Sequence, residues 1–103
     1  MTTRITMPDD CETMTEVREG VDQTDRDLLA LLERRYGYMR AAARIKQDRG
    51  TVRDERRKAQ VIEAMRDGAA RAGLPAHDIA GLWDMLVESS IAYELAAWDR
   101  LRR

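Results

Sequence analysis

The feature that most constrains the fold is a long stretch without proline. After Pro8 the next proline is Pro75, and between about residues 11 and 47 apolar side chains recur at steps of three and four. This spacing is typical of one face of an amphipathic helix, and the two glycines within it only weaken the pattern. The sequence therefore predicts one helix over about residues 11–47. Its apolar positions are Val17, Val21, Leu28, Leu31, Leu32, Met39, Ala42 and Ile45.

The length of this helix has a consequence for assembly. About 36 residues rise by roughly 54 Å, whereas a compact domain of about 100 residues has a radius of gyration near 13 Å. The apolar stripe continues to both ends of the helix. Another chain must then cover the part that projects, and an antiparallel copy related by a twofold axis is the simplest cover. We expect an intertwined helical homodimer.

Local signals divide the rest of the chain. Asp9 and Asp10, or Thr13 followed three residues later by Glu16, are suitable caps for the first helix. A turn at residues 48–51 leads to a second helix over about residues 53–72, with Thr51 and Asp54 as its starting signal. Gly73 ends that helix, and a third follows over about residues 77–101. We predict an all-α fold with a flexible N-terminus at residues 1–9 and a single domain at residues 10–103.

Composition excludes several classes of function. The net charge is −1, from 18 basic and 19 acidic residues, so no global field attracts nucleic acid or a membrane, and a cationic site must be local. The lone Cys11 excludes an intramolecular disulfide, and no apolar run approaches a membrane span. We found no metal-ligand spacing, phosphate loop or Ser-His-Asp set. These features predict a cytoplasmic protein without a metal or a cofactor.

Charged residues on the apolar face of the long helix suggest a binding site. Arg35 and Lys46 stand eleven residues apart, which is about three turns, so they point almost the same way. Burying a cation without an anionic partner is costly, so the pattern favours a pocket for a small molecule with several negative charges. The alternative is a solvated face whose side-chain stems cover apolar surface.

Other polar residues join this candidate set. Ser90 and Glu94 interrupt the apolar stripe of the third helix one turn apart, whereas a salt bridge at the rim would also explain Glu94. Asp54 and Arg57 share a face of the second helix, where a weak surface ion pair is the alternative. Arg18 lies 28 residues before Lys46, about 42 Å along the helix, and could reach the same ligand only from a partner chain.

These residues, in this order, resemble the all-helical class of chorismate mutases and the closely related isochorismate-pyruvate lyases. The similarity extends from about Asp10 to Arg102. It is carried by VREGVDQTD at residues 17–25, LLERR at 31–35, AARIK at 42–46, VRDERR at 52–57 and SSIAYE at 89–94.

The resemblance implies roles for the candidate residues. Arg18 would come from the partner chain, Arg35 and Arg57 would bind the substrate carboxylates, and Asp54 would meet the ring hydroxyl or nearby backbone. Ser90 would lie near the ring carboxylate, whereas Lys46 and Glu94 would face the ether oxygen. Two departures from the family pattern are Glu94, where many members have Gln, and Lys58, where mutases often have Glu.

The implied reaction is the rearrangement of chorismate to prephenate in aromatic amino-acid biosynthesis. It is unimolecular and needs no cofactor. Lys46, Glu94 and Arg35 would be the catalytic residues. Isochorismate-pyruvate lyase and aminodeoxychorismate mutase are alternatives that would use the same cationic pocket. A non-enzymatic helical dimer is an alternative of another class, and it predicts that Arg35, Lys46 and Glu94 face solvent or form ordinary ion pairs.

Overall fold

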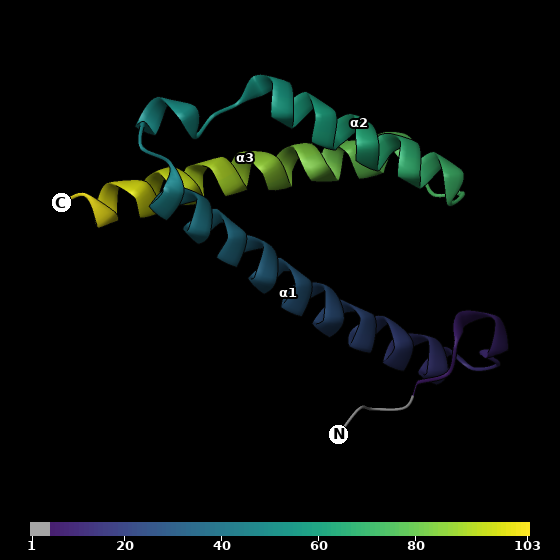
Figure 1. Cartoon of the computed structure of the whole chain (residues 1–103). Coiled ribbons are helices and arrows are strands. Elements are labelled where there is room, and N and C mark those ends of the chain that lie inside the picture. Colours follow the sequence, from purple (N-terminus) through teal and green to yellow (C-terminus); the bar gives the residue numbers. More distant parts are fainter. Residues whose placement is uncertain (1–4) are drawn as a thin grey trace. The chain divides into compact units, whose positions relative to one another are not determined.

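The computed structural model describes residues 5–103, and every regular element within them is helical (Figure 1). The α-helices are α1 at Met14–Ile45, α2 at Glu55–Arg71 and α3 at Ala76–Leu101. Two short 3-10 helices precede α1 and α2, namely η1 at Pro8–Asp10 and η2 at Arg49–Thr51. The predicted all-α fold and its three helices are confirmed.

The chain divides into two compact units, one that ends at Arg35 and one from Tyr36 to Arg103. Helix α1 contributes to both units because it continues from Met14 to Ile45. The second unit contains the end of α1 together with η2, α2 and α3.

In the first unit, a capping box sets the start of α1. The amide of Thr13 donates to Oε1 of Glu16 at 3.0 Å, and the amide of Glu16 donates back to Oγ1 of Thr13 at 3.2 Å. The hydroxyl of Thr6 donates to the same carboxylate at 3.0 Å. Bonds from the Glu12 amide, Thr6 and Thr13 lower the pKa of Glu16. The helix begins three residues later than predicted because this box, and not Asp9 or Asp10, caps it.

The prediction of a flexible N-terminus concerns residues 1–9. Residues 1–4 lie outside those described, whereas Pro8–Asp10 form η1 and Thr6 bonds to Glu16. The thiol of Cys11 contacts the carbonyl oxygen of Thr6 at 3.8 Å. Desolvation, with the carboxylates of Glu16 and Asp10, raises the pKa of this thiol, which disfavours the reactive thiolate. The division of the chain into residues 1–9 and 10–103 stays a prediction.

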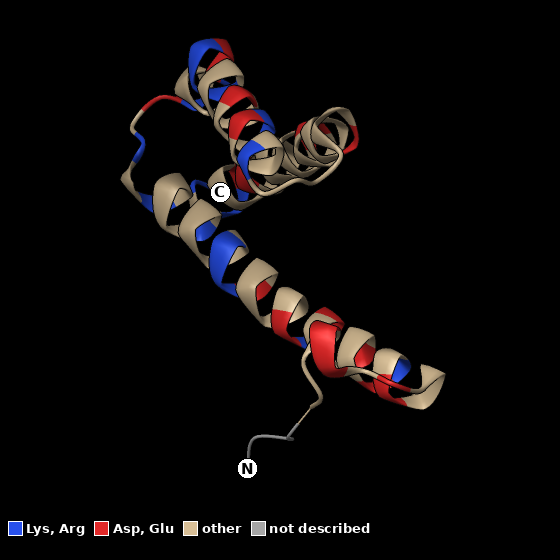
Figure 2. Ribbon diagram, turned by 90° about the vertical axis from the view of Figure 1, so that its right-hand side faces the viewer, with Lys and Arg blue, Asp and Glu red and all other residues tan. Residues whose placement is uncertain are grey.

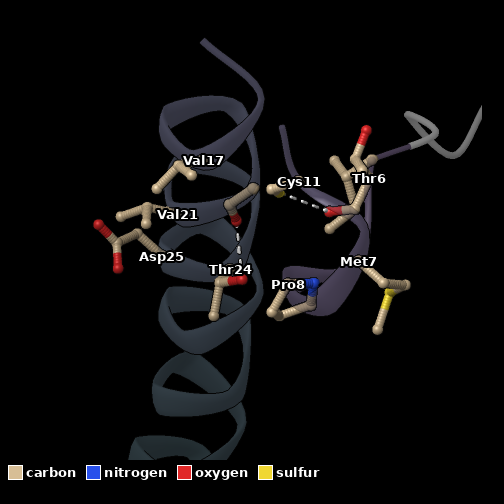
Figure 3. A pocket seen from close by; sticks show the side chains of 10 residues that line it. Thr6, Met7, Pro8, Cys11, Val17, Val21, Thr24 and Asp25 are labelled. Carbon is tan, nitrogen blue, oxygen red and sulfur yellow. Dashed lines mark hydrogen bonds between the residues drawn. The ribbon is translucent and has the colours of Figure 1, made fainter. Parts of the chain in front are cut away.

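This N-terminal segment and the first turns of α1 line a pocket of about 400 Å³ (Figure 3). Met7 and Pro8 come from the segment, and Val17 and Val21 come from α1. None of the candidate site residues lines this pocket. Its lining is largely apolar, and Val21 and Met7 remain 52% and 61% exposed.

In the second unit, side-chain and backbone caps fix the ends of α2. A carboxylate oxygen of Asp54 accepts a hydrogen bond from the amide of Arg57 at 3.0 Å, so Asp54 is the N-cap. Thr51 instead belongs to η2, where its hydroxyl donates to the carbonyl oxygen of Asp48 at 2.7 Å. At the other end Gly73 adopts a φ of 73°, a left-handed conformation, and the amide of Leu74 bonds to the carbonyl oxygen of Ala69. The predicted stop at Gly73 is confirmed.

Helices α2 and α3 pack side by side (Figure 1). Val52, which follows η2, and Val87 and Ile91 of α3 form the buried cluster, and Val61 of α2 packs against it. Burial of each such side chain contributes about 1.5–3 kcal/mol. On the outside, Nζ of Lys58 lies 2.9 Å from Asp84 and 2.8 Å from Glu88, and Arg53 also pairs with Glu88 at 2.7 Å.

Polar contacts also join the end of α1 to α3. The hydroxyls of Tyr36 and Ser89 lie 2.7 Å apart, and Nη1 of Arg40 donates to the hydroxyl of Tyr93 at 2.8 Å. The rings of Tyr36 and Tyr93 meet edge to face at 4.9 Å. These contacts hold the last turns of α1 against the helix that carries Ser90 and Glu94.

We predict that Glu88→Gln destabilises the chain most near neutral pH. Arg53, followed by Lys58, lowers the pKa of Glu88 from its ordinary 4.5 to about 2. A lowered folded-state pKa contributes stability that is complete above the unfolded value and disappears as pH falls through the folded value. The difference in Tm between wild type and variant should therefore shrink between about pH 4.5 and pH 2, as followed by circular dichroism. Glu63→Gln, which removes the exposed pair with Arg66, is the control and should show a small difference throughout.

Candidate functional site

The strongest candidate centre is an ion pair between the end of α1 and the middle of α3. Nζ of Lys46 lies 2.8 Å from Oε2 of Glu94. Lys46 is the first residue after α1, and its amide still donates to the carbonyl oxygen of Ala42 at 2.9 Å. Glu94 is only 4% exposed, whereas the Lys46 side chain is 30% exposed. The carboxylate thus lies in the interior, and the ammonium lies between it and the surface.

The apolar pattern of α3 explains why Glu94 is buried. Its neighbours on the same face, Val87, Ile91 and Ala97, are buried too, so the polar residue follows the helix into the interior. Ser90, one turn earlier, is 3% exposed and donates to the carbonyl oxygen of Leu86 at 2.7 Å. That bond satisfies the serine hydroxyl within its own helix.

The carboxylate of Glu94 is incompletely satisfied. Its buried Oε2 accepts no hydrogen bond of good geometry from the described residues, so the ammonium of Lys46 compensates it by charge attraction alone. A buried carboxylate with a vacant acceptor position costs free energy.

Asp54 and Arg57 lie at the start of α2, but their side chains do not pair. Asp54 accepts a hydrogen bond from the Arg57 amide, which gives the carboxylate a structural role. The guanidinium of Arg57 is exposed and has no hydrogen bond or ion pair with the part of the chain that the structure describes. The surface ion pair considered from the sequence is therefore absent there, and the cation remains open to a ligand.

Arg18 and Arg35 both lie on the part of α1 that belongs to the first unit. Arg18 is exposed and Arg35 is partly buried. The structure brings Lys46 and Glu94 together, with Ser90 one turn away on α3. The roles of the two arginines stay predictions.

Comparison with known proteins identifies the family. A family model described as chorismate mutase type II matches residues 17–95. The chain belongs to the chorismate mutase type II family. It is also 30% identical over 95 residues to an isochorismate pyruvate lyase of Pseudomonas aeruginosa, which covers 92% of this chain and 94% of the relative. Membership in this family supports an enzyme that acts on a chorismate-type substrate.

Lys58 departs from the pattern expected of the mutases in this family. Its side chain is 20% exposed and pairs with Asp84 and Glu88 of α3. Hydrogen bonds to Glu88 and then Asp84 raise the pKa of the ammonium, which therefore stays charged. Here Lys58 links α2 to α3.

Charge is distributed unevenly along α1 (Figure 2). Acidic residues gather in its first half, and basic residues gather in its second half, toward Lys46. The overall charge of −1 therefore contains a local cationic region, as the sequence analysis required.

Trp98 is one contact of the site that sequence reasoning missed. The pattern identified it only as part of the apolar stripe of α3, but its indole Nε1 donates to the carbonyl oxygen of Lys46 at 3.1 Å. A signal existed, because a tryptophan that is at least partly buried, as Trp98 is, usually finds an acceptor for its N–H. The sequence did not identify which acceptor it would find.

Two further searches concern the described residues only. No group of three or more His, Cys, Asp and Glu side chains there is arranged to hold a metal ion. No helix among residues 5–103 combines the length and apolar character that crossing a membrane requires.

We predict that Asp54→Ala lowers the free energy of unfolding by about 1 kcal/mol, because the first turn of α2 loses its cap. Asp54→Asn should keep nearly all of this stability, because an amide oxygen also accepts from the Arg57 amide. Urea denaturation of both variants measures the difference. Equal stability of the two variants would contradict the capping role, and the activity of the folded Asn variant reports separately on any contact with substrate.

Proposed function

We propose that this protein is a cytoplasmic, homodimeric chorismate mutase that converts chorismate to prephenate in aromatic amino-acid biosynthesis. The observation that carries the proposal is the pair of Lys46 and buried Glu94 at 2.8 Å. These are the two positions at which the family resemblance expects contacts with the ether oxygen of the substrate.

The reaction breaks the ether C–O bond and forms a C–C bond within one molecule. Catalysis then requires a compact, chair-like substrate and stabilisation of the negative charge that develops on the ether oxygen. The ammonium of Lys46 supplies a positive charge at that oxygen. The guanidinium groups of Arg35 and Arg57 hold the carboxylates, and Ser90 lies near the ring carboxylate. Asp54, besides capping α2, meets the ring hydroxyl or the backbone beside it.

Glu94 takes part as a neutral acid. An ionised carboxylate would repel both the dianionic substrate and the charge on the ether oxygen, whereas a protonated one donates a hydrogen bond to it. In the structure the partner of Glu94 is Lys46, and substrate binding redirects that ammonium to the ligand. We infer that Glu94 takes up a proton when substrate binds.

The partner chain supplies Arg18. Exposed apolar side chains along α1 support a second copy as the cover of this helix, since Leu28 and Leu31 are 52% and 50% exposed. Arg18 lies on the same helix and is exposed. It would reach the site of the other protomer, so that each of the two sites is shared between chains.

The lyase is the second candidate function, and the name of the Pseudomonas relative favours it. Elimination of pyruvate from isochorismate also breaks a C–O bond and also needs a cation at the ether oxygen. Asp54 caps α2, so its presence does not separate the mutase from the lyase. The ion pair of Lys46 with Glu94 is also what a non-enzymatic module would show, so the preference for an enzyme rests on the family match.

Product analysis tests the proposal directly. We expect the purified protein to convert chorismate to prephenate, measured by loss of chorismate absorbance and by chromatography, with a higher kcat/KM than for isochorismate. Aminodeoxychorismate is the third substrate to compare. Release of pyruvate and salicylate from isochorismate, without formation of prephenate, would assign the lyase instead.

We predict that kcat/KM of the wild type falls with rising pH, because binding is coupled to uptake of one proton by Glu94. Glu94→Gln donates a hydrogen bond without titrating, so its profile should be flatter. A wild-type profile that is level from about pH 5 to pH 9 would remove Glu94 from this role.

A shared site predicts complementation between inactive chains. Arg18→Ala and Arg35→Ala homodimers should both be inactive, whereas a mixture that exchanges subunits should recover up to about a quarter of wild-type activity. The reason is that half of the dimers are mixed and one of their two sites is intact. Subunit exchange is confirmed by native mass spectrometry. No recovery despite exchange would contradict a site shared between chains.

A further inference from the structure

The backbone of Lys46 is held by two donors from the end of α3. The indole Nε1 of Trp98 lies 3.1 Å from the carbonyl oxygen of Lys46, and Nη2 of Arg102 lies 2.7 Å from the same oxygen. Nη1 of Arg102 also donates to the carbonyl oxygen of Ala43 at 3.0 Å. One guanidinium therefore binds two carbonyl groups that the end of α1 leaves without helical partners.

The guanidinium is itself held in place. Its central carbon lies 4.2 Å from the centre of the Trp98 ring, which is a cation–π contact. A weaker bond, at 3.4 Å, joins Nη1 to the carbonyl oxygen of Trp98. Trp98 thus binds Lys46 directly and also orients the second donor.

Glu94 and Trp98 lie four residues apart on α3, and Arg102, four residues further on, is the first residue after the helix. Residues at this spacing share one face of a helix. Along this face Glu94 pairs with the ammonium of Lys46, and the other two residues hold its carbonyl group. Helix α3 and the residue that follows it therefore bind both the ammonium and the backbone carbonyl group of Lys46.

We propose that Trp98 and Arg102 are positioning residues for the ammonium of Lys46, an inference that rests on the proposed function. The ion pair with Glu94 fixes this ammonium only while Glu94 is ionised, and catalysis requires Glu94 to be neutral. When Glu94 is neutral, the hydrogen bonds from Trp98 and Arg102 to the carbonyl oxygen of Lys46 remain. They keep Cα of Lys46, which is beyond the last helical residue, at the distance from which its ammonium reaches the ether oxygen.

The competing explanation is that these bonds only stabilise the end of α1. Removing a purely structural cap lowers Tm but leaves kcat of the folded enzyme unchanged. A positioning role predicts a lower kcat at nearly constant KM, because Arg35 and Arg57 still bind the carboxylates. Misplacement of a catalytic group by about 1 Å costs up to about 100-fold in rate.

The test compares Arg102→Leu, Arg102→Lys and Trp98→Phe below their measured Tm values. Trp98→Phe keeps an aromatic ring but removes the N–H donor, and Arg102→Lys keeps one charged donor. We expect kcat to fall by roughly 10- to 100-fold in Arg102→Leu, less in the other two. Arg100→Leu is the matched control, because Arg100 lies in the same last turn and makes no hydrogen bond or ion pair with the described residues. It should retain wild-type kcat.

A double-mutant cycle with Lys46→Ala separates the two explanations. If Arg102 acts through Lys46, adding Arg102→Leu to Lys46→Ala should lower kcat no further. The same fold-loss in both backgrounds, or a normal kcat in Arg102→Leu despite a lower Tm, would overturn the proposal.

Amide hydrogen exchange tests, without any substrate, whether the hydrogen bonds to the carbonyl oxygen of Lys46 stabilise the backbone there. The Lys46 amide, which donates to Ala42, should exchange at least about tenfold faster in Arg102→Leu than in Arg100→Leu. If the wild type converts no chorismate-type substrate, the proposed function fails, and faster exchange still supports the structural part of this inference. Unchanged exchange would overturn the inference whatever the activity.

Discussion

The pairing of Lys46 with Glu94 is the interaction on which the rest of the site depends. Glu94 is 4% exposed, and only a nearby cation makes an ionised carboxylate tolerable at that depth. The cation comes from the first residue after α1, so the pair fixes where this helix ends against α3. Oε2 of Glu94 has no hydrogen bond of good geometry among the described residues, and its partner there is the ammonium of Lys46.

The site combines residues with two purposes. Asp54 caps α2 and Ser90 bonds to its own helix, so both have structural reasons for their positions. Arg57 has no such structural partner within the described residues, and its exposed guanidinium stays accessible to an anion. The proposed pericyclic reaction would need only such placed charges and shape, without a covalent bond between protein and substrate.

Lys58 departs from the family pattern, and its charge is compensated by neighbouring residues of the fold. A cation replaces the expected acid on α2, and two acids of α3 surround it. Mutases often have an acid at this position. In this chain the lysine instead links α2 to α3.

The sequence by itself determined the three helices, the stop at Gly73 and the set of polar residues on apolar faces, because helical periodicity and capping are local properties. It left open whether Glu94 was a rim residue or a buried one, and it attributed Trp98 to packing alone. Only the tertiary structure decided these points. Burial and pairing depend on which distant segments meet, and the contacts of Lys46 with Glu94, Trp98 and Arg102 join residues about 50 positions apart.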